Sequence, residues 1–144
     1  MKRVNDILAA KGHEIWSVAP RTSVFDALRL MAEKRIGAVL VLEGGKLVGL
    51  FSERDYARKI ILVGKSSKET PVSEIMSREL VCVGPGQLTG DCMRLMTDNR
   101  VRHLPVVSGG ALHGIVTIGD VVKAIIAEKE HEIEQLQHYI TGTV

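Results

Sequence analysis

The chain contains an internal repeat, and this repeat limits its fold more than any other feature of the sequence. Residues 16–61 align without a gap on residues 81–126, at an offset of 65, and about a third of the aligned pairs are identical. The most distinctive match joins GLFSERD (49–55) to GIVTIGD (114–120), in which the glycine, the hydroxyl and the carboxylate keep their spacing. Because similarity at a fixed offset marks repeated structural units, the chain should fold as two copies of one small unit.

A short lead-in precedes each copy. VNDIL (4–8) resembles VSEIM (72–76), and each lead-in is expected to form a short helix, over 4–10 and 72–77. The polar stretch GKSSKET (64–70) lies between the copies and is typical of a linker. We therefore divide the chain by sequence into four parts. They are repeat 1 (4–63), the linker (64–70), repeat 2 (71–127), and a C-terminal helical extension and tail (128–144).

Within each copy the residue pattern predicts the same order of elements, roughly α-β-α-β-β-α. A short extended segment ends at a proline (15–19 and 80–84), and an amphipathic helix follows, with Val24, Ala27 and Met31 on one face in the first copy. An apolar strand, a turn built on two glycines and a second strand come next, which indicates a hairpin. Each unit is too small to be stable alone, so the two should pack together through their apolar sheets.

Composition and motif content exclude several classes of function. The net charge of +2 does not suggest a nucleic-acid surface, and the longest apolar run is far shorter than a membrane span. Cys82 and Cys92 form no CxxC motif and are expected to be reduced, buried thiols in a cytoplasmic protein. The histidines lack metal-ligand spacing, and the motifs of serine hydrolases, P-loop enzymes and dinucleotide-binding enzymes are absent. We therefore predict a protein that is not an enzyme and binds no metal, nucleic acid or membrane.

The repeated hydroxyl and carboxylate allow two interpretations. Ser52 with Asp55, and Thr117 with Asp120, match the capping box at which a helix begins, so helix capping alone would explain either copy. A helix N-terminus also offers unpaired amides and a partial positive charge that suit a phosphate, and a carboxylate beside it suits a ribose diol. Duplication favours a paired, symmetric site without excluding the capping role.

With these motifs in place, the chain resembles a known family, the tandem pair of CBS domains, or Bateman module. The resemblance spans Val4 to about Ala127 and rests on the order, spacing and duplication of LPVV, GG, GIVT and the motif aspartate. Within the family, SERDYARK (52–59) and MRLMTDNRVRHLPVV (93–107) resemble the small stand-alone bacterial proteins made of one pair and a C-terminal helix. The fold implied is α/β (α+β): two repeats with pseudo-twofold symmetry, sheets packed together, helices outside, and an extended C-terminal helix.

The resemblance also implies a function and a set of ligand contacts. Members of the family are regulatory sensors that bind AMP, ADP, ATP, NAD(H) or S-adenosylmethionine in clefts between the copies, and no cofactor is required. The motif hydroxyl and carboxylate would contact phosphate and ribose, which assigns Ser52 and Asp55 to one site and Thr117 and Asp120 to the other. Further assignments are Val18 and Val83 beside the adenine, Arg102 and His103 as phosphate contacts, and Arg54 and Arg58 on the helix after the first motif.

The two sites are not expected to be equal. Arg102 and His103 stand at a strand start in the second copy, where the first copy has Gly37 and Ala38. The second site should therefore suit a phosphate better. Each arginine is equally consistent with a solvated surface position or a salt bridge.

The segment 121–140 is predicted to be one long helix with apolar residues near heptad spacing. Beyond Ala127 nothing local covers this apolar stripe, so we expect a dimer or partner-docking role, and the alternative is a helix that packs back on its own domain. The predicted partners are an adenine nucleotide, a second copy in a homodimer of CBS pairs, and an unidentified regulated protein. The alternative function is a non-catalytic interaction or dimerisation scaffold in which the motif only caps helices.

Overall fold

In the computed structural model, which describes residues 1–142, the chain forms two compact units. The first unit is the continuous segment Glu14–Leu80. We call it the first unit because repeat 1 supplies its sheet. The second unit combines Met1–His13 with the chain from Val81 onward. The division in space therefore does not coincide with the repeats of the sequence, because the first lead-in belongs to the second unit.

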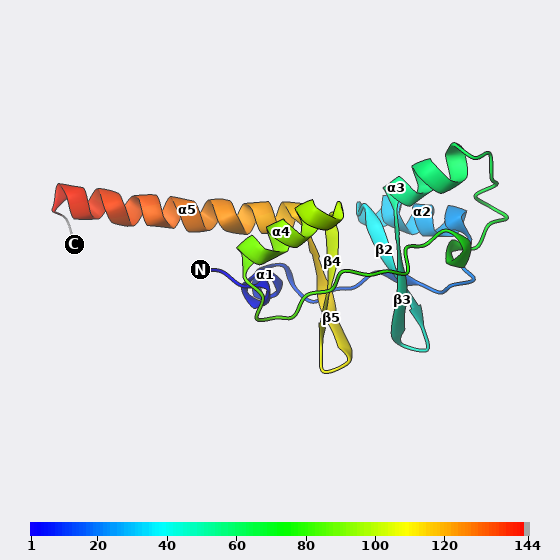
Figure 1. Cartoon of the computed structure of the whole chain (residues 1–144), viewed down its shortest axis with the longest axis horizontal. Coiled ribbons are helices and arrows are strands. Elements are labelled where there is room, and N and C mark those ends of the chain that lie inside the picture. Colours follow the sequence, from blue (N-terminus) through cyan, green and yellow to red (C-terminus); the bar gives the residue numbers. More distant parts are fainter. Residues whose placement is uncertain (143–144) are drawn as a thin grey trace. The chain divides into compact units, whose positions relative to one another are not determined.

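The first unit is built around a three-stranded sheet in the order β1-β2-β3, of which Figure 1 labels β2 and β3. β1 runs parallel to β2, and β2 and β3 form an antiparallel hairpin. Gly44 and Gly45 make its turn with φ values of 56° and 79°, and positive φ at both turn residues is what a tight hairpin requires. Its elements are β1 (Ser17–Val18), α2 (Val24–Lys34), β2 (Ala38–Glu43), β3 (Lys46–Ser52), α3 (Glu53–Tyr56), the π-helix η1 (Ala57–Ile61) and the 3-10 helix η2 (Val72–Glu74).

The second unit repeats this plan around the antiparallel hairpin β4-β5. Val83 forms a single parallel bridge to Val106, at the position where Val18 pairs with Val41 in the first unit. The extended segment predicted at 80–84 is thus reduced to one bridge. The elements of this unit are α1 (Val4–Lys11), α4 (Thr89–Asn99), β4 (His103–Ser108), β5 (Ala111–Thr117) and α5 (Ile118–Thr141).

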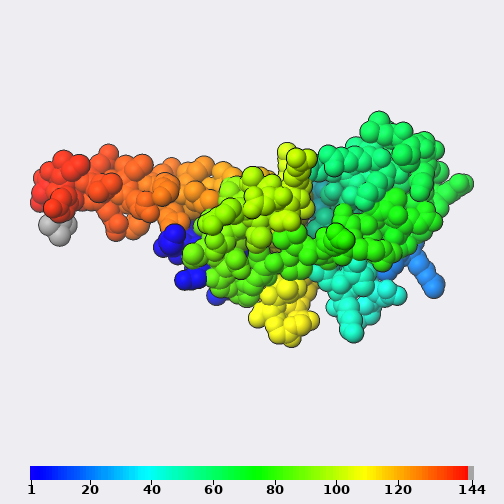
Figure 2. Space-filling model, in the orientation of Figure 1, coloured from blue at the N-terminus to red at the C-terminus, as the bar shows by residue number. Residues whose placement is uncertain are grey.

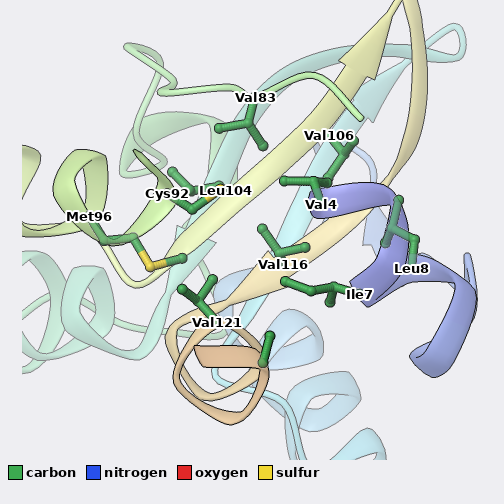
Figure 3. Close-up of a cluster of buried hydrophobic side chains, with 11 residues drawn as sticks. Val4, Ile7, Leu8, Val83, Cys92, Met96, Leu104, Val106, Val116 and Val121 are labelled. Carbon is green, nitrogen blue, oxygen red and sulfur yellow. The ribbon is translucent and has the colours of Figure 1, made fainter. Parts of the chain in front are cut away.

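Each core includes the lead-in that precedes the other repeat. Val4, Ile7 and Leu8 of α1 are buried in the second unit, where Figure 3 shows them beside Val106 and Val116. The equivalent residues of the second lead-in belong to the core of the first unit; they are Val72, Ile75 and Met76. The similarity of VNDIL to VSEIM therefore reflects two equivalent places in two cores.

A strand glycine lies under each lead-in. A Cβ added at Gly114 of β5 would lie 2.9 Å from Cδ2 of Leu8, and one added at Gly49 of β3 would lie 2.8 Å from Cγ of Met76. These glycines begin the repeated heptapeptides. Part of the repeat is therefore explained by packing, since an apolar side chain approaches the strand at a distance that only glycine permits.

Two local expectations are wrong. The helix predicted at 72–77 is only the single 3-10 turn of η2, because Ser77 exchanges backbone hydrogen bonds of 2.9 and 3.0 Å with Leu50 and thereby becomes extended. Cys92 is buried as expected, but Cys82 is exposed. Cys82 precedes the buried Val83 in an extended stretch, where successive side chains point to opposite sides.

Replacing Gly114 with alanine should lower the free energy of unfolding by about 1–3 kcal/mol, the usual cost of overpacking a core. Leu8 is only 1% exposed, so it has little room to move away from the new methyl group. Urea unfolding followed by circular dichroism measures the change. Gly90→Ala on α4 is the matched control, because its Cβ would meet nothing within 4 Å. Equal effects of the two substitutions would contradict the packing role of Gly114.

Candidate functional site

The first motif lies where β3 ends and α3 begins. Ser52 is the N-cap of α3, and its Oγ accepts a hydrogen bond from the amide of Asp55 at 3.3 Å. In return, Oδ2 of Asp55 accepts hydrogen bonds from the amide of Ser52 at 3.0 Å and from its hydroxyl at 3.2 Å. Asp55 is buried, with 8% of its surface exposed. The reciprocal bonds of a capping box thus hold a buried carboxylate at the start of a helix.

The second motif repeats this geometry where β5 meets α5. The amide of Thr117 donates to Oδ2 of Asp120 at 2.9 Å, and the amide of Asp120 donates to Oγ1 of Thr117 at 3.1 Å. Thr117 is the N-cap of α5. The capping geometry predicted from the sequence is therefore confirmed in both copies, which leaves open only whether these groups also bind a ligand.

A lysine that the sequence analysis did not single out contacts the first carboxylate. Nζ of Lys59 lies 3.2 Å from Oδ1 of Asp55 and donates to the carbonyl oxygen of Ile75 at 2.9 Å. Ile75 belongs to the lead-in packed in this unit, so Lys59 connects the motif to that lead-in. The i, i+4 spacing of Asp55 and Lys59 is the signal that could have revealed the pair in advance.

The second carboxylate has a lysine from a different part of the chain. Nζ of Lys11, at the end of α1, lies 2.7 Å from Oδ2 of Asp120 and donates to the carbonyl oxygen of Ile115 at 3.1 Å. Lys11 and Asp120 are 109 residues apart, and no local pattern announces their contact. In both copies a lysine therefore joins the motif to a lead-in. Lys59 belongs to the helical segment that follows its motif, whereas Lys11 belongs to the lead-in helix α1.

The structure brings Arg102 and His103 to the second motif, as expected. The amide of Ile118, in the first turn of α5, donates to the carbonyl oxygen of Arg102 at 2.9 Å, and His103 pairs with Thr117 across the hairpin. The first motif has Gly37 and Ala38 in these places: Glu53 donates to Gly37 at 3.1 Å and Ala38 pairs with Ser52. On the strand side of the two motifs the difference predicted from the sequence is thus present, with arginine and histidine beside the second and glycine and alanine beside the first.

The electrostatics of the second motif favour a charged carboxylate and a neutral imidazole. Burial alone would raise the pKa of Asp120, but the hydrogen bonds from Lys11 and Thr117 outweigh it and hold the pKa below the usual range. Burial and the nearby Lys11 lower the pKa of His103, against the opposing influence of Asp120. At neutral pH this site therefore combines one carboxylate with the cations Lys11 and Arg102.

The other residues predicted to contact a ligand differ in how exposed they are. Val18 is half-buried, whereas the side chain of Val83 is 3% exposed and lies in the core of the second unit (Figure 3). Arg54 and Arg58 are both exposed and stand on α3 and η1, directly after the first motif. Their proposed contacts with a ligand stay predictions, since these positions show only where each side chain lies.

The two carboxylates differ in their capacity to accept further hydrogen bonds. Asp55 uses Oδ2 for its cap and Oδ1 for Lys59. Asp120 uses Oδ2 for both its cap and Lys11, so within residues 1–142 its Oδ1 has no hydrogen-bond donor. A diol that approaches Asp120 would therefore find an oxygen that is ready to accept, beside a helix start that suits an anion.

Comparison with known proteins places these features in a family. A model of the CBS domain matches residues 4–62 and again residues 72–127. The chain is 40% identical over 149 residues to the mitochondrial CBS domain-containing protein CBSX3 of Arabidopsis thaliana, with coverage of 96% of this chain and 72% of that protein. A solved CBS-domain protein from Burkholderia ambifaria MC40-6 superimposes with a TM-score of 0.85 at 50% identity, over 88% of this chain and 95% of that one.

A more distant structure shares the same fold. It is the CBS domain pair of protein MJ0100, solved in complex with 5′-methylthioadenosine and S-adenosyl-L-methionine. It has a TM-score of 0.77 at 22% identity and covers 89% of this chain and 98% of that one.

Among the helices of residues 1–142, none has the length and apolar character needed to cross a membrane.

The free protein should lose stability as the pH falls below about 6.5, the ordinary pKa of histidine. The unfolded chain takes up a proton at His103 near that pH, whereas the folded chain resists protonation until its lowered pKa is reached. Urea unfolding at about pH 7.5 and about pH 5.5 should therefore show a smaller difference for His103→Gln than for the unaltered protein. His131→Gln, at an exposed position on α5, is the control. Identical pH profiles for the two variants would contradict this assignment.

Proposed function

This chain belongs to the CBS-domain family, and on that premise we propose that it is a non-catalytic regulatory module that binds an adenosine ligand. The candidates are AMP, ADP, ATP and NAD(H), with S-adenosylmethionine as a further one. The complex of the MJ0100 domain pair with two adenosine compounds supports this class of ligand. The cytoplasm stays the predicted compartment, although the similar A. thaliana protein is mitochondrial.

The observation that carries the proposal is that both copies of the motif have the same arrangement of hydroxyl, carboxylate and reciprocal backbone bonds. A capping role alone needs an acceptor at the N-cap, and many residues at the third helical position would serve it. Here both copies have the same hydroxyl and carboxylate, each carboxylate is held by backbone bonds, and each has a lysine beside it. A fixed carboxylate suits the hydroxyl groups of a ribose, and the helix start beside it suits a phosphate.

The second motif is the better candidate for a phosphate-bearing ligand. Arg102 and His103 lie beside it, Lys11 is within 2.7 Å of its carboxylate, and Asp120 retains an acceptor oxygen. The first motif is flanked on the strand side by Gly37 and Ala38, and the cation in contact with its carboxylate, Lys59, stands on the helical side. We therefore expect the two sites to bind the same ligand with different affinities.

The lysine contacts suggest how occupancy is transmitted. A ribose that binds Asp120 must share the carboxylate with Lys11 or displace it, and Lys11 stands on α1. The corresponding event at Asp55 affects Lys59 and its bond to Ile75 of the other lead-in. In either copy the ligand would act on a lead-in segment, and this gives the predicted conformational signal a physical path.

Asp120→Ala and Asp55→Ala should each weaken binding of the adenosine ligand by about 1.5–3 kcal/mol, the range for hydrogen bonds to a charged group. Isothermal titration calorimetry with AMP, ATP, NAD(H) and S-adenosylmethionine measures the loss. Asp26→Ala is the matched control, because Asp26 occupies the same position in a helix capped by Ser23 outside the motif. If none of the compounds binds, the result supports the scaffold alternative. Equal losses of binding affinity in all three variants would support it as well.

A second copy of the chain is the other proposed partner. Ile61 and Ile126 occupy equivalent positions on the helical segments that follow the two motifs, and both are about half exposed, at 58% and 52%. Neighbouring apolar side chains are exposed in both places, Leu62 and Val63 beside Ile61 and Val122 one turn before Ile126, and such apolar patches mark interaction surfaces. We propose that these patches form the contact between CBS pairs in a homodimer.

Ile61→Glu should shift the protein towards the monomer, because it places a charge in the proposed contact. Light scattering coupled to size-exclusion chromatography gives the mass at several concentrations. Ala32→Glu adds the same charge at an exposed position on α2 and should leave the mass unchanged. If both variants keep the mass of the unaltered protein, Ile61 has no part in self-association.

A further inference from the structure

We infer that the exposed apolar stripe of α5 pairs with the same stripe of a second copy, as a parallel two-stranded coiled coil. The inference rests on the proposed homodimer for the presence of a second copy, and it adds a further contact and a direction. A parallel coil would place the second units of the two copies on the same side of the assembly.

The stripe runs along the full length of α5, on a different face from the one that packs in its own unit. Val121 and Ala124 are buried against the second unit, whereas Val122 is 39% exposed. From residue 129 to residue 142 every residue is exposed. Figure 1 shows this part of α5 continuing straight beyond α1 and α4, and Figure 2 shows its last turns uncovered on the face drawn. The helix therefore does not fold back on its own unit, which was the alternative left open by the sequence.

The heptad positions specify a type of coiled coil. Three isoleucines fall at successive a positions, namely Ile126, Ile133 and Ile140, with exposed fractions of 52%, 54% and 79%. The d positions hold Val122, Lys129 and Leu136. β-branched residues at a with leucine at d favour two parallel strands over larger assemblies. All three a positions and Leu136 at d fit this pattern, whereas Val122 and Lys129 do not. We therefore assign the stripe to one occupant, a second copy in the same direction.

The charges at the flanking e and g positions support the same direction. In a parallel pair, each g residue faces the e residue five positions later on the other chain. Glu132 would then face Gln137, and Ile125 would face Glu130, so no two carboxylates meet. In the antiparallel register that overlaps the most a and d layers, Glu130 would face Glu130 and Glu132 would face Glu132. The parallel pair has one like-charged contact, Lys129 facing Lys129 at d, whereas this antiparallel pair opposes carboxylates at two positions.

Lys129 is the one charged residue in the stripe. Its Nζ lies 3.3 Å from Oε2 of Glu132, which occupies the neighbouring g position. This contact draws the ammonium to the edge of the stripe and leaves the aliphatic stem to cover the interface. A single polar core position of this kind weakens a coiled coil but helps to fix its register.

The coil is too short to assemble the protein alone. The stripe from Ile126 to Ile140 spans about 21 Å at 1.5 Å per residue, and isolated helices of this length are marginal in water. Once two CBS pairs are in contact, however, pairing of the tails becomes an intramolecular event with a high effective concentration. The tails should therefore pair in the dimer and not before it.

Cysteine cross-linking of the full chain tests the inference. In a background of Cys82→Ser and Cys92→Ala, a single Ile133→Cys should form a disulfide-linked dimer under mild oxidation. His131→Cys, on the opposite face of the tail, should remain unlinked. Light scattering of the same samples reports whether a second copy is bound. A dimer without the Ile133→Cys link overturns the coil and leaves the homodimer standing, whereas a monomer overturns both.

A mixing experiment tests the direction. Val122→Cys and Ile140→Cys are made as separate proteins, one of them isotopically labelled, and are oxidised together. A parallel coil links Val122→Cys to itself and Ile140→Cys to itself, because equivalent positions face each other. The antiparallel register would instead link the two variants to each other, and a predominance of such mixed dimers would overturn the parallel arrangement.

Discussion

The contact between a lead-in side chain and a strand glycine is the interaction on which the rest of the structure depends. Leu8 over Gly114 and Met76 over Gly49 hold the lead-ins in their cores. Leu8 and Lys11 are three residues apart on α1 and therefore share a face of that helix. When Leu8 occupies its place, Lys11 reaches Asp120. Packing and the candidate site are thus parts of one arrangement, and the glycine of the repeated heptapeptide serves both.

The two copies reach the same local result with different residues. Each motif carboxylate takes part in the capping box of the helix that follows it, and one lysine contacts it. That lysine comes from η1 in the first unit and from α1 in the second. The surroundings have diverged further, since only the second motif has Arg102 and His103.

The sequence predicts those structural features that are determined by residues close together along the chain. The glycine turns, the two capping boxes and the single long helix follow from local patterns, and the structure confirms them. It does not predict the place of the lead-ins, because their packing depends on segments many residues away. Lys11 was missed for the same reason, whereas Lys59 stands one helical turn from Asp55 and could have been found. The role of the motifs in binding remains a proposal, because capping and binding require the same residue types.

Nuclear magnetic resonance can show directly whether the two helix starts bind an adenosine ligand. Backbone amides are followed while an adenosine ligand, beginning with AMP, is added to the protein. If both motifs bind it, the amides of residues 52–55 and 117–120 should show saturable shifts, with little change at the turn residues Gly44 and Gly109. Unchanged spectra at both motifs with AMP, ATP, NAD(H) and S-adenosylmethionine would contradict the proposed binding and leave only the capping role.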